Sequence, residues 1–208
     1  IARTESSLAA SPSTADGSKA LVPTYKMDGP AVYDLVYLDG HYSPGFSSPA
    51  AGPSGVTAAS LASVASDNAF DLEGQVGRYA PTDNDGFAAL NTAFLCDGAY
   101  IHVADGHAEK VMVRISYITT DGTEPKVTYP RTLIVAGANT DITVVESYSG
   151  PKDRLYFTNA VTEISVGEGA RIDHYRLLLE GDKSFHVGTN RVKQERDSSF
   201  SSASFTLG

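Results

Sequence analysis

Cysteine is almost absent from this chain of 208 residues, which has one cysteine, no tryptophan and two methionines. A single cysteine excludes an internal disulfide framework and fits a reducing compartment. No stretch approaches the roughly 18 consecutive apolar residues of a membrane span. No basic-then-apolar signal segment opens the chain. We therefore expect a cytoplasmic protein that does not enter a membrane.

Positive charge is also scarce. The 16 Lys and Arg residues are outnumbered by 25 Asp and Glu residues, and the net charge is −9 at pH 7. Nucleic acids and anionic membranes are bound by basic surfaces, so we expect neither partner. The 19 glycines and 10 prolines indicate many short elements joined by turns.

The first part of the chain predicts a lead-in followed by a hairpin. Residues 1–30 are rich in Ser, Ala and Thr with little periodicity, and we interpret them as partly disordered or helical. Residues 31–38 are β-branched and aromatic, and Asp39-Gly40 separates them from His41-Tyr42. An Asp-Gly pair between two such runs is typical of a hairpin, because both central residues of its turn need positive φ.

Two short helices are expected before residue 98. Residues 57–64 place Leu61 and Val64 on one face of the first helix. The second has capping side chains at 83–85 and then Phe87, Leu90 and Phe94 at intervals of three and four. We expect it to end near Cys96.

From residue 99 onward, short β-rich runs follow one another with small polar turns between them. They are Tyr100–Val103, Val111–Ile118, Arg131–Val135, Ile142–Val145, Val161–Val166, Ala170–Leu179, His186–Gln194 and Ser199–Leu207. A loose repeat also lays residues 138–144 over 169–175 and then over 196–202, with an offset of about 27 to 31 residues. Units of this kind bury their apolar face by stacking, which favours a β-solenoid. An antiparallel β-sandwich is the alternative.

Several segments resemble the SufB/SufD family of iron–sulfur cluster assembly proteins. Residues 87–106 resemble its F-x-x-L-N-x-A helix leading into D-G-x-x-(I/V)-x-V-P-x-G, although Ala104 stands where the family usually has proline. Residues 130–139 resemble R-x-L-I-(I/V), and residues 170–177 resemble A-x-(L/I)-x-(H/Y). Residues 197–208 resemble D-(A/S)-x-(F/L) followed by (F/L)-x-x-G-G, one residue short of the second glycine. Residues 32–47 also fit the opening of SufD-like chains.

The resemblance implies a right-handed parallel β-helix and a non-catalytic scaffold role in the SUF system. It implies two partners, a SufB-like paralogue and a SufC-like ABC ATPase that docks on a C-terminal helical region of both. It implies no cofactor held by this chain, because the full complex handles the iron–sulfur cluster transiently. The family histidine implicated in cluster building, and the surface that pairs with SufB, lie C-terminal to the matched segments.

One position indicates that the chain resembles a SufD-like member, of which it would be the N-terminal portion, more than a SufB-like member. SufB-like members read Y-L-E-G-C-T-A-P after the R-x-L-I strand, and residues 144–151 here read V-V-E-S-Y-S-G-P. Tyr148 therefore stands at the position of the cysteine. A phenol neither relays persulfide sulfur nor binds soft iron as a thiolate does.

Side chains that could hold iron are few, and we expect no metal site in this chain. Cys96 and His174 are the weak candidates. We interpret Cys96 as a small buried apolar residue and His174 as a packing residue or a surface residue of a strand. His102, His107 and His186 are expected in solvated turns or at the start of a strand.

A protein of another class remains the alternative. Glu163, Glu168 and Asp173 could fall on one solenoid face, as a carbohydrate-active β-helix enzyme would need for acid and base catalysis. Charged outer faces also simply keep a solenoid soluble, and another β-solenoid binding module would show the same pattern. We expect no catalysis in this chain.

The resulting organisation has three parts: the lead-in over 1–30, a hairpin and helical entry segment over 31–98, and a β-helix core over 99–208. We expect this core to be truncated at its C-terminal end. The last run carries Phe200, Phe205 and Leu207 with little charge, and so lacks the usual protection of a sheet edge. We therefore expect self-association through this end, or fraying.

Overall fold

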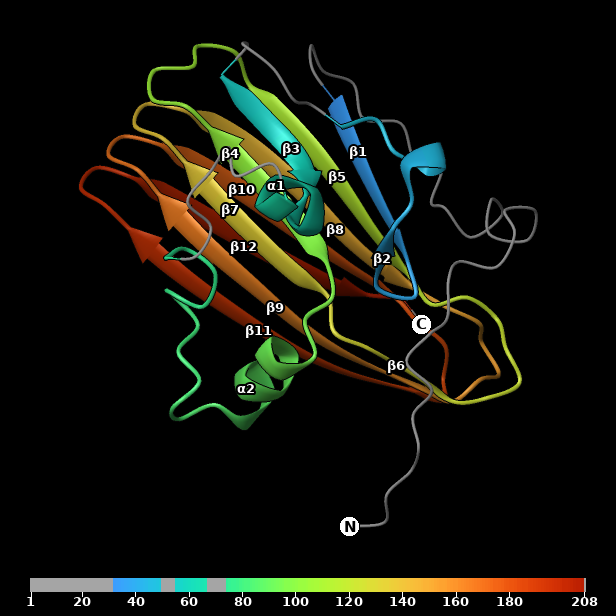
Figure 1. Ribbon diagram of the computed structural model, residues 1–208. Coiled ribbons are helices and arrows are strands. Elements are labelled where there is room, and N and C mark those ends of the chain that lie inside the picture. The colour runs from blue at the N-terminus through green and yellow to red at the C-terminus, as the bar shows by residue number, and fades with distance from the viewer. Residues whose placement is uncertain (1–31, 50–54, 67–73, 208) are drawn as a thin grey trace.

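Strands dominate the computed structural model, which describes residues 32–49, 55–66 and 74–207. Two sheets lie face to face, and the chain passes from one to the other to form a β-solenoid of about four turns (Figure 1). The expected solenoid is confirmed. The pairing of its strands is parallel except for two antiparallel pairs, so the alternative of an antiparallel sandwich is wrong. The lead-in over 1–30 lies outside the described residues.

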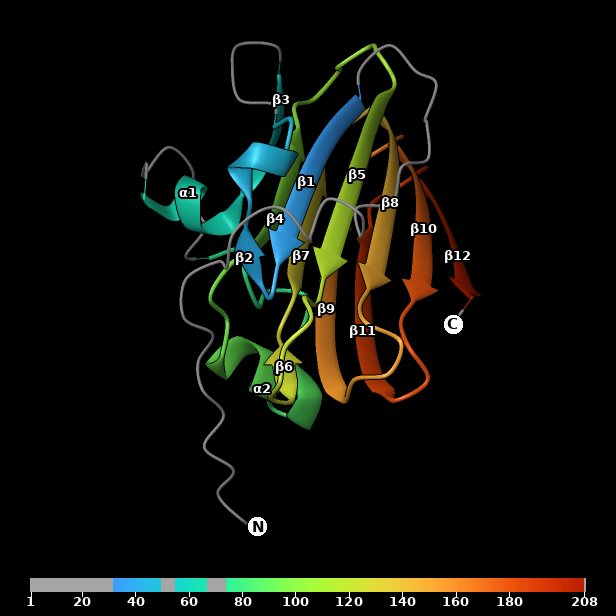
Figure 2. The same ribbon diagram turned by 90° about the vertical axis from the view of Figure 1, so that its right-hand side faces the viewer.

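Each sheet gathers strands that are far apart in the sequence. Sheet A contains, in spatial order, β2 (His41–Tyr42), β1 (Val32–Leu38), β5 (Val111–Ile118), β8 (Asp141–Ser149), β10 (Arg171–Leu179) and β12 (Ser199–Thr206). Sheet B contains β3 (Val56–Ser60), β4 (Gly98–Val103), β7 (Arg131–Ala136), β9 (Tyr156–Val166) and β11 (Ser184–Gln194), with β6 (Lys126–Thr128) also paired to β9. Figure 2 shows the parallel strands of sheet A side by side.

The main core lies between the sheets. Its apolar side chains alternate along each strand, so that every second residue points inward. Leu35, Val113, Val144 and Ile172 face Ile101, Ile134 and Ile164 from the other sheet, and all seven are fully buried. Equivalent residues of successive coils stack, which is how the repeat buries an apolar face that one coil alone would expose.

The predicted hairpin is confirmed in its details. Leu38 pairs with His41 and Tyr37 pairs with Tyr42. Asp39 and Gly40 have φ values of 49° and 84°, which are the positive angles that the two-residue turn requires. Strand β1 also pairs in parallel with β5, so the hairpin joins sheet A of the solenoid.

The first predicted helix is wrong over half its length. Residues 56–60 form β3, which pairs antiparallel with β4, and only α1 (Leu61–Ser66) is helical. Pairing with β4 supplies backbone hydrogen bonds that outweigh the helical preference of Ala58 and Ala59.

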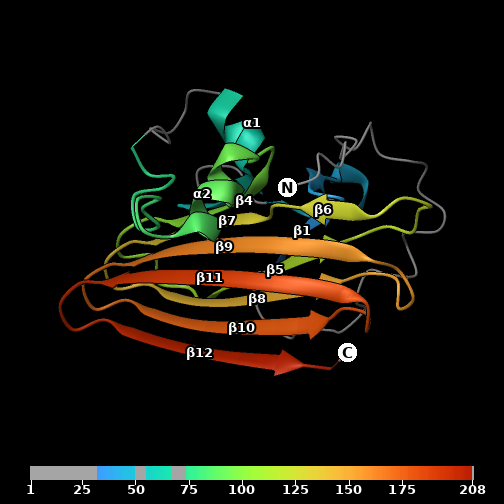
Figure 3. The same ribbon diagram turned by 90° about the horizontal axis from the view of Figure 1, so that it is seen from below.

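The second helix exists as α2 (Gly86–Ala93), and the Asp85 side chain caps it by accepting from the N–H groups of Phe87 and Ala88. Its buried residues are Ala88 and Asn91, whereas Phe87 and Phe94 are each 47% exposed. The predicted aromatic stripe is therefore not the packed face. Figure 3 shows α1 and α2 on the side of sheet B.

Two details of the strand predictions also change. Strand β6 was not predicted, and the repeat register shifts by one residue between β8 and β10, since Ile142 aligns with Ile172 and Phe200. In a strand a one-residue shift exchanges inward and outward side chains. The short 3-10 helix at Pro44–Phe46 completes the described elements, and no helix in the described ranges is long and apolar enough to cross a membrane.

Candidate functional site

Three tyrosines stack inside the solenoid along one row of sheet A. Tyr37, Tyr117 and Tyr148 come from β1, β5 and β8, and the ring centroids of successive pairs are 4.9 and 5.2 Å apart. The Tyr37 hydroxyl donates to the Gly98 carbonyl and the Tyr117 hydroxyl donates to the Arg131 carbonyl. Burial, more than any other cause, raises the pKa of all three phenols well above the usual value. They are therefore neutral side chains at physiological pH.

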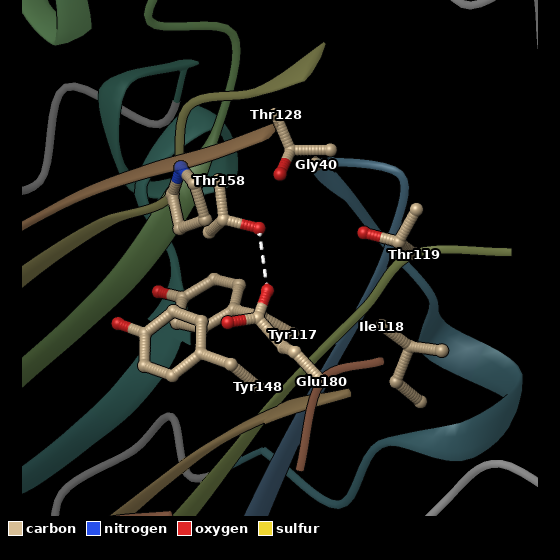
Figure 4. Close-up of a pocket in the computed structure, with 9 residues that line it drawn as sticks. Gly40, Tyr117, Ile118, Thr119, Thr128, Tyr148, Thr158 and Glu180 are labelled. Atoms are coloured by element: carbon tan, nitrogen blue, oxygen red, sulfur yellow. Dashed lines mark hydrogen bonds between the residues drawn. The ribbon is translucent and has the colours of Figure 1, made fainter. Parts of the chain in front are cut away.

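A hollow of about 10 Å³ lies at the end of this row, enough space for about one water molecule. Tyr117, Tyr148, Thr158 and Glu180 line it (Figure 4). The Thr158 hydroxyl donates to Glu180 over 2.8 Å, the bond drawn in Figure 4. On its other oxygen, Glu180 bonds His186 Nδ1 over 2.7 Å, and the His186 ring contacts the Tyr148 ring edge to face at 4.8 Å.

A fully buried carboxylate, Glu146, lies between the two sheets. It points inward from β8 and accepts hydrogen bonds from the hydroxyls of Thr132 and Thr162 in sheet B, at 2.5 and 3.1 Å. Its other partner is His174 Nε2 at 2.9 Å, and His174 Nδ1 lies 3.3 Å from the Ser202 hydroxyl. Both Glu146 and His174 are 0% exposed. The pair and its partners therefore connect five strands, β7 to β10 and β12, and neither Glu146 nor His174 contacts solvent.

The charge state of Glu146 follows from these partners. Burial alone would raise the pKa of the carboxyl, but the hydrogen bond from His174 and the positive charge of His174 and Arg176 lower the pKa to about 2. The hydrogen bond from the Thr132 hydroxyl also lowers the pKa of Glu146. Glu146 is thus ionised in the interior, where an unpaired carboxylate would be strongly destabilising.

Arg176, whose side chain is 11% exposed, extends this polar interior toward β11. Arg176 is in register with Glu146 on the next strand, and its Nη2 donates to the Asn190 side chain across the interior. The same Nη2 lies 3.9 Å from Glu146, which is beyond hydrogen-bonding distance. Arg176 Nε and His186 Nε2 are buried, and neither has a hydrogen-bond partner among the described residues. The interior therefore offers polar groups suited to a small polar species, with no thiol among them.

A second buried ion pair lies on the outer face of sheet B. Arg131 and Glu163 are both 0% exposed and bonded to each other. Glu163 also accepts from the backbone N–H groups of Gly77, Tyr79 and Ala80, at 2.8 to 3.0 Å. This arrangement fixes the segment before α2 against the sheet.

Asn91 fixes helix α2 to the same surface. Its amide donates to the carbonyls of Pro130 and Asn159, and its oxygen accepts from Arg131. All the polar atoms named here bond one another or the backbone, so we interpret this outer cluster as a structural clamp.

The two weak metal candidates from the sequence lie in different environments. Cys96 is exposed, after the end of α2, so its interpretation as a buried apolar residue is wrong. Asn91 within the helix is buried, whereas Phe94 and Cys96, beyond its end at Ala93, are exposed. His174 packs in the interior, so the interpretation as a packing residue is confirmed and the interpretation as a surface residue is wrong. No group of three or more His, Cys, Asp or Glu residues in the described part of the chain is arranged to hold a metal ion.

Two of the other histidines, His102 and His186, differ from the solvated residues that the sequence predicts, whereas His107 lies at the turn as expected. His102 lies within β4, half-buried, and burial lowers the pKa of its imidazole. His107 follows the turn at Asp105-Gly106. His186 was expected at the start of a solvated strand, but it points into the interior toward Glu180, because β11 places alternate residues inward.

The three carboxylates of the alternative enzyme do not come together. Glu163 is buried under the segment before α2 on sheet B, Asp173 lies on β10 in sheet A, and Glu168 is in the exposed turn between these strands, paired with Arg196. The arrangement required for acid and base catalysis on a sugar is absent from these residues.

Sequence reasoning missed Glu146 and Arg176, the two charged residues at the centre of the interior. The alternation of side chains in the sequence contains a signal for both residues. Glu146 alternates with Val144 and Tyr148 in a strand that is otherwise apolar on that face, and Arg176 alternates with His174 and Leu178 in the next repeat. A charge in an inward position of a strand indicates a buried partner.

Comparison with known proteins gives matches to two family descriptions. Residues 12–115 match "SufBD protein N-terminal region", and residues 117–208 match "SUF system FeS cluster assembly, SufBD core domain". Together they cover most of the chain.

Curated proteins agree with these matches. The chain is 30% identical over 183 residues to the iron–sulfur cluster assembly SufBD family protein slr0076 of Synechocystis sp., covering 84% of the chain and 40% of that relative. It is 34% identical over 113 residues to the iron–sulfur cluster assembly SufBD family protein ABCI9 of Arabidopsis thaliana, covering 52% of the chain and 23% of that relative. The chain thus spans less than half the length of these relatives.

Proposed function

The chain belongs to the SufB/SufD family of the SUF iron–sulfur cluster assembly system, and from this premise we propose that it is a non-catalytic, SufD-like scaffold subunit. Its proposed partners are a SufB-like paralogue and a SufC-like ABC ATPase. The proposed compartment is the cytoplasm. A plastid is the alternative, because the name of a third relative, protein ABCI7 of Arabidopsis thaliana, describes that protein as chloroplastic.

Tyr148 is the observation that supports a SufD-like rather than a SufB-like role. It occupies the position where SufB-like members carry a cysteine, and its ring is 1% exposed between Tyr117 and His186. The high pKa of the phenol leaves it protonated, and a neutral phenol neither carries persulfide sulfur nor binds iron. The only thiol of the chain, Cys96, is on the surface.

Copurification tests the partners. The protein, tagged and expressed with SufB-like and SufC-like proteins, should recover both in one complex. Recovery of neither partner would contradict the scaffold proposal. Recovery of the ATPase with a second copy of this protein, and no paralogue, would favour a SufB-like role instead.

Anaerobic reconstitution tests the proposal that this chain holds no cluster of its own. After incubation with iron and sulfide and then desalting, the isolated protein should retain far less than one cluster per chain, since one exposed cysteine cannot supply the usual four ligands. Near-stoichiometric iron with a visible charge-transfer band, lost in Cys96→Ala, would show that two chains share a cluster.

Self-association through β12 is the remaining part of the proposal. In the described residues β12 pairs only with β10, and Phe205 and Leu207 are 47% and 71% exposed beside it. An apolar edge that no further strand covers pairs with other chains. Sedimentation of the protein should show dimers or larger species, and Phe205→Lys should reduce them. A monomer at all concentrations would contradict this part alone.

A further inference from the structure

The outward side chains of sheet A include a row without charge that crosses all the long strands of the sheet. It consists of Val36, Ser116, Ser147, Leu177 and Phe205, which are in register on β1, β5, β8, β10 and β12. These residues alternate with the inward residues of the core, so they point away from sheet B. Helices α1 and α2 lie on the other side of the molecule, against sheet B (Figure 3). A sheet face of this kind is stabilised when another element covers it.

Burial changes along the row. Ser116 and Ser147 are 2% and 1% exposed, whereas Phe205 is 47% exposed. Val145 and Ser149, the outward residues on either side of Ser147 in β8, are 8% and 9% exposed. Two adjacent serine side chains are too short to shield each other from solvent. Their burial therefore indicates that another segment lies over β5 and β8 and stops before β12.

The described elements do not supply this cover. Phe46 of the 3-10 helix packs against Val36, Leu38 and Ile118, and it covers only the part of the face beside β1. The strands next to β8 are β5 and β10, and both lie in its own sheet. Among the described residues, the outward face of β8 thus has no partner from another layer.

Connectivity excludes the two internal gaps in the described chain. Residues 50–54 connect the edge of β1 to β3 of sheet B, which leaves them no length to reach β8. Residues 67–73 connect α1 to the segment before α2, and both of these lie on sheet B. Residues 1–31 remain, and they lead directly into β1 at Val32.

We propose that residues 20–27 pack over the outward face of β5 and β8, with Leu21 and Val22 as the main apolar contacts. These residues read A-L-V-P-T-Y-K-M and are the most apolar part of residues 1–31. The match to the SufBD N-terminal region begins at residue 12 and includes them. The occupant of the face is therefore a segment of the same chain.

The connection to β1 is long enough for this contact. Ser147 is in register with a position four residues along the strand direction from Val32 and lies two strands across the sheet, so the two are about 16 Å apart. The five peptide units from Met27 to Val32 span up to about 17 Å. A segment that ends at Met27 can therefore lie over the buried serines.

Cysteine labelling of the full chain tests the cover. In a Cys96→Ser background, which removes the only cysteine, Ser147→Cys should react with a maleimide about tenfold or more slowly than Ser199→Cys, because a covered thiol reacts only after local opening. Ser199 is the matched control, since it is an exposed outward residue of β12 in the same sheet. Equal rates at the two positions would show that the face is open and would overturn the proposal.

A pair of charges then tests the occupant. Leu21→Asp with Val22→Asp should raise the labelling rate of Ser147→Cys about tenfold, because carboxylates do not pack on an uncharged face. Leu8→Asp with Ala9→Asp adds the same charge outside residues 20–27 and should leave the rate unchanged. Protection that survives the first pair of substitutions would overturn the proposal. Protection that disappears on dilution of the unsubstituted segment would overturn it too, and would identify a second copy of the chain as the cover.

Circular dichroism verifies that each variant folds, and a cross-link gives a measurement that needs no charged substitution. A benzophenone amino acid at Tyr25 should cross-link, within one chain, to peptides that contain β5 or β8. Cross-links confined to sheet B, or formed only between chains, would overturn the proposal.

Discussion

Two glutamates of this solenoid are 0% exposed, and they are stabilised in different ways. Glu163, outside sheet B, is held by Arg131 and by three backbone N–H groups. Glu146, between the sheets, is held by two threonine hydroxyls and by the imidazole of His174. The partners of Glu163 are a guanidinium and backbone N–H groups, which keep their protons at all ordinary pH values, whereas Glu146 depends on two neutral hydroxyls and one imidazole. The outer cluster is therefore a clamp with a full countercharge in direct contact, and the inner carboxylate is held mainly by hydrogen-bond donors.

The clamp should give the largest effect on stability. Glu163→Gln leaves Arg131 buried without its counterion and turns amide hydrogens toward backbone donors. Removal of one partner from a buried pair costs about 3 to 5 kcal/mol, so we expect the free energy of unfolding in urea to fall by about 4 kcal/mol. The segment before α2 should also lose hydrogen-exchange protection, because its N–H groups lose their acceptor.

Glu168→Gln is the matched control for this variant. Glu168 pairs with Arg196 on the surface, where the side chains are 56% and 76% exposed, and pairs of this kind contribute little. An equal loss of stability in both variants would show that the clamp contributes no more than a surface charge, and the comparison between the two buried glutamates would then have no basis.

This comparison also shows what the sequence could and could not predict. The hairpin, most of the strand runs after residue 99 and the solenoid follow from local pattern, because turn residues and alternating side chains are local properties. The clamp joins Gly77 to Glu163, which are 86 residues apart. No local periodicity encodes such a contact. Asn91 was missed for the same reason, since its role depends on carbonyls from two distant strands.

The register of the repeat decides which side chains of a strand are predicted to point into the solenoid. The repeat was recognised, but its alignment differs by one residue from the pairing of β8 with β10. That shift conceals the inward position of Arg176 in register with Glu146. Glu146 itself needed no register, because alternation with Val144 and Tyr148 was enough to place it inside.

The next largest effect on stability should appear at acid pH. The pKa of Glu146 is lowered from 4.5 to about 2 in the folded protein, so its contribution to stability is complete above about pH 4.5 and is lost as the pH falls toward 2. The shift corresponds to roughly 3 kcal/mol. We expect the difference in unfolding free energy between the wild type and Glu146→Gln to shrink across this range. A difference that stays constant with pH would show that folding does not lower the pKa of Glu146, and one that grows as the pH falls would contradict the sign.

His174→Leu tests the imidazole partner. It removes the hydrogen bond to Glu146 and the charge that helps keep this carboxylate ionised. We expect a loss of about 2 kcal/mol, because a charged buried acceptor loses one donor. A double-mutant cycle with Glu146→Gln should give a coupling energy of about 1 to 2 kcal/mol. His107→Leu, in a turn away from both glutamates, is the control and should show no coupling.

The smallest effect should come from the hydroxyl donors, and it separates their contribution from that of the imidazole. Thr162 donates to both oxygens of Glu146, and Thr162→Val keeps the side-chain shape while removing the donor. We expect a loss of about 1 kcal/mol, typical of one hydrogen bond to a buried acceptor that keeps others. Thr162→Ser retains the hydroxyl and should restore most of the bond's contribution, at the cost of the methyl group. In the background of Glu146→Gln the valine variant should cost less, since the carboxylate is gone. An undiminished cost there would mean that Thr162 stabilises the strand by packing alone, and the ionised state of Glu146 would then depend on Thr132, His174 and the nearby charge of Arg176.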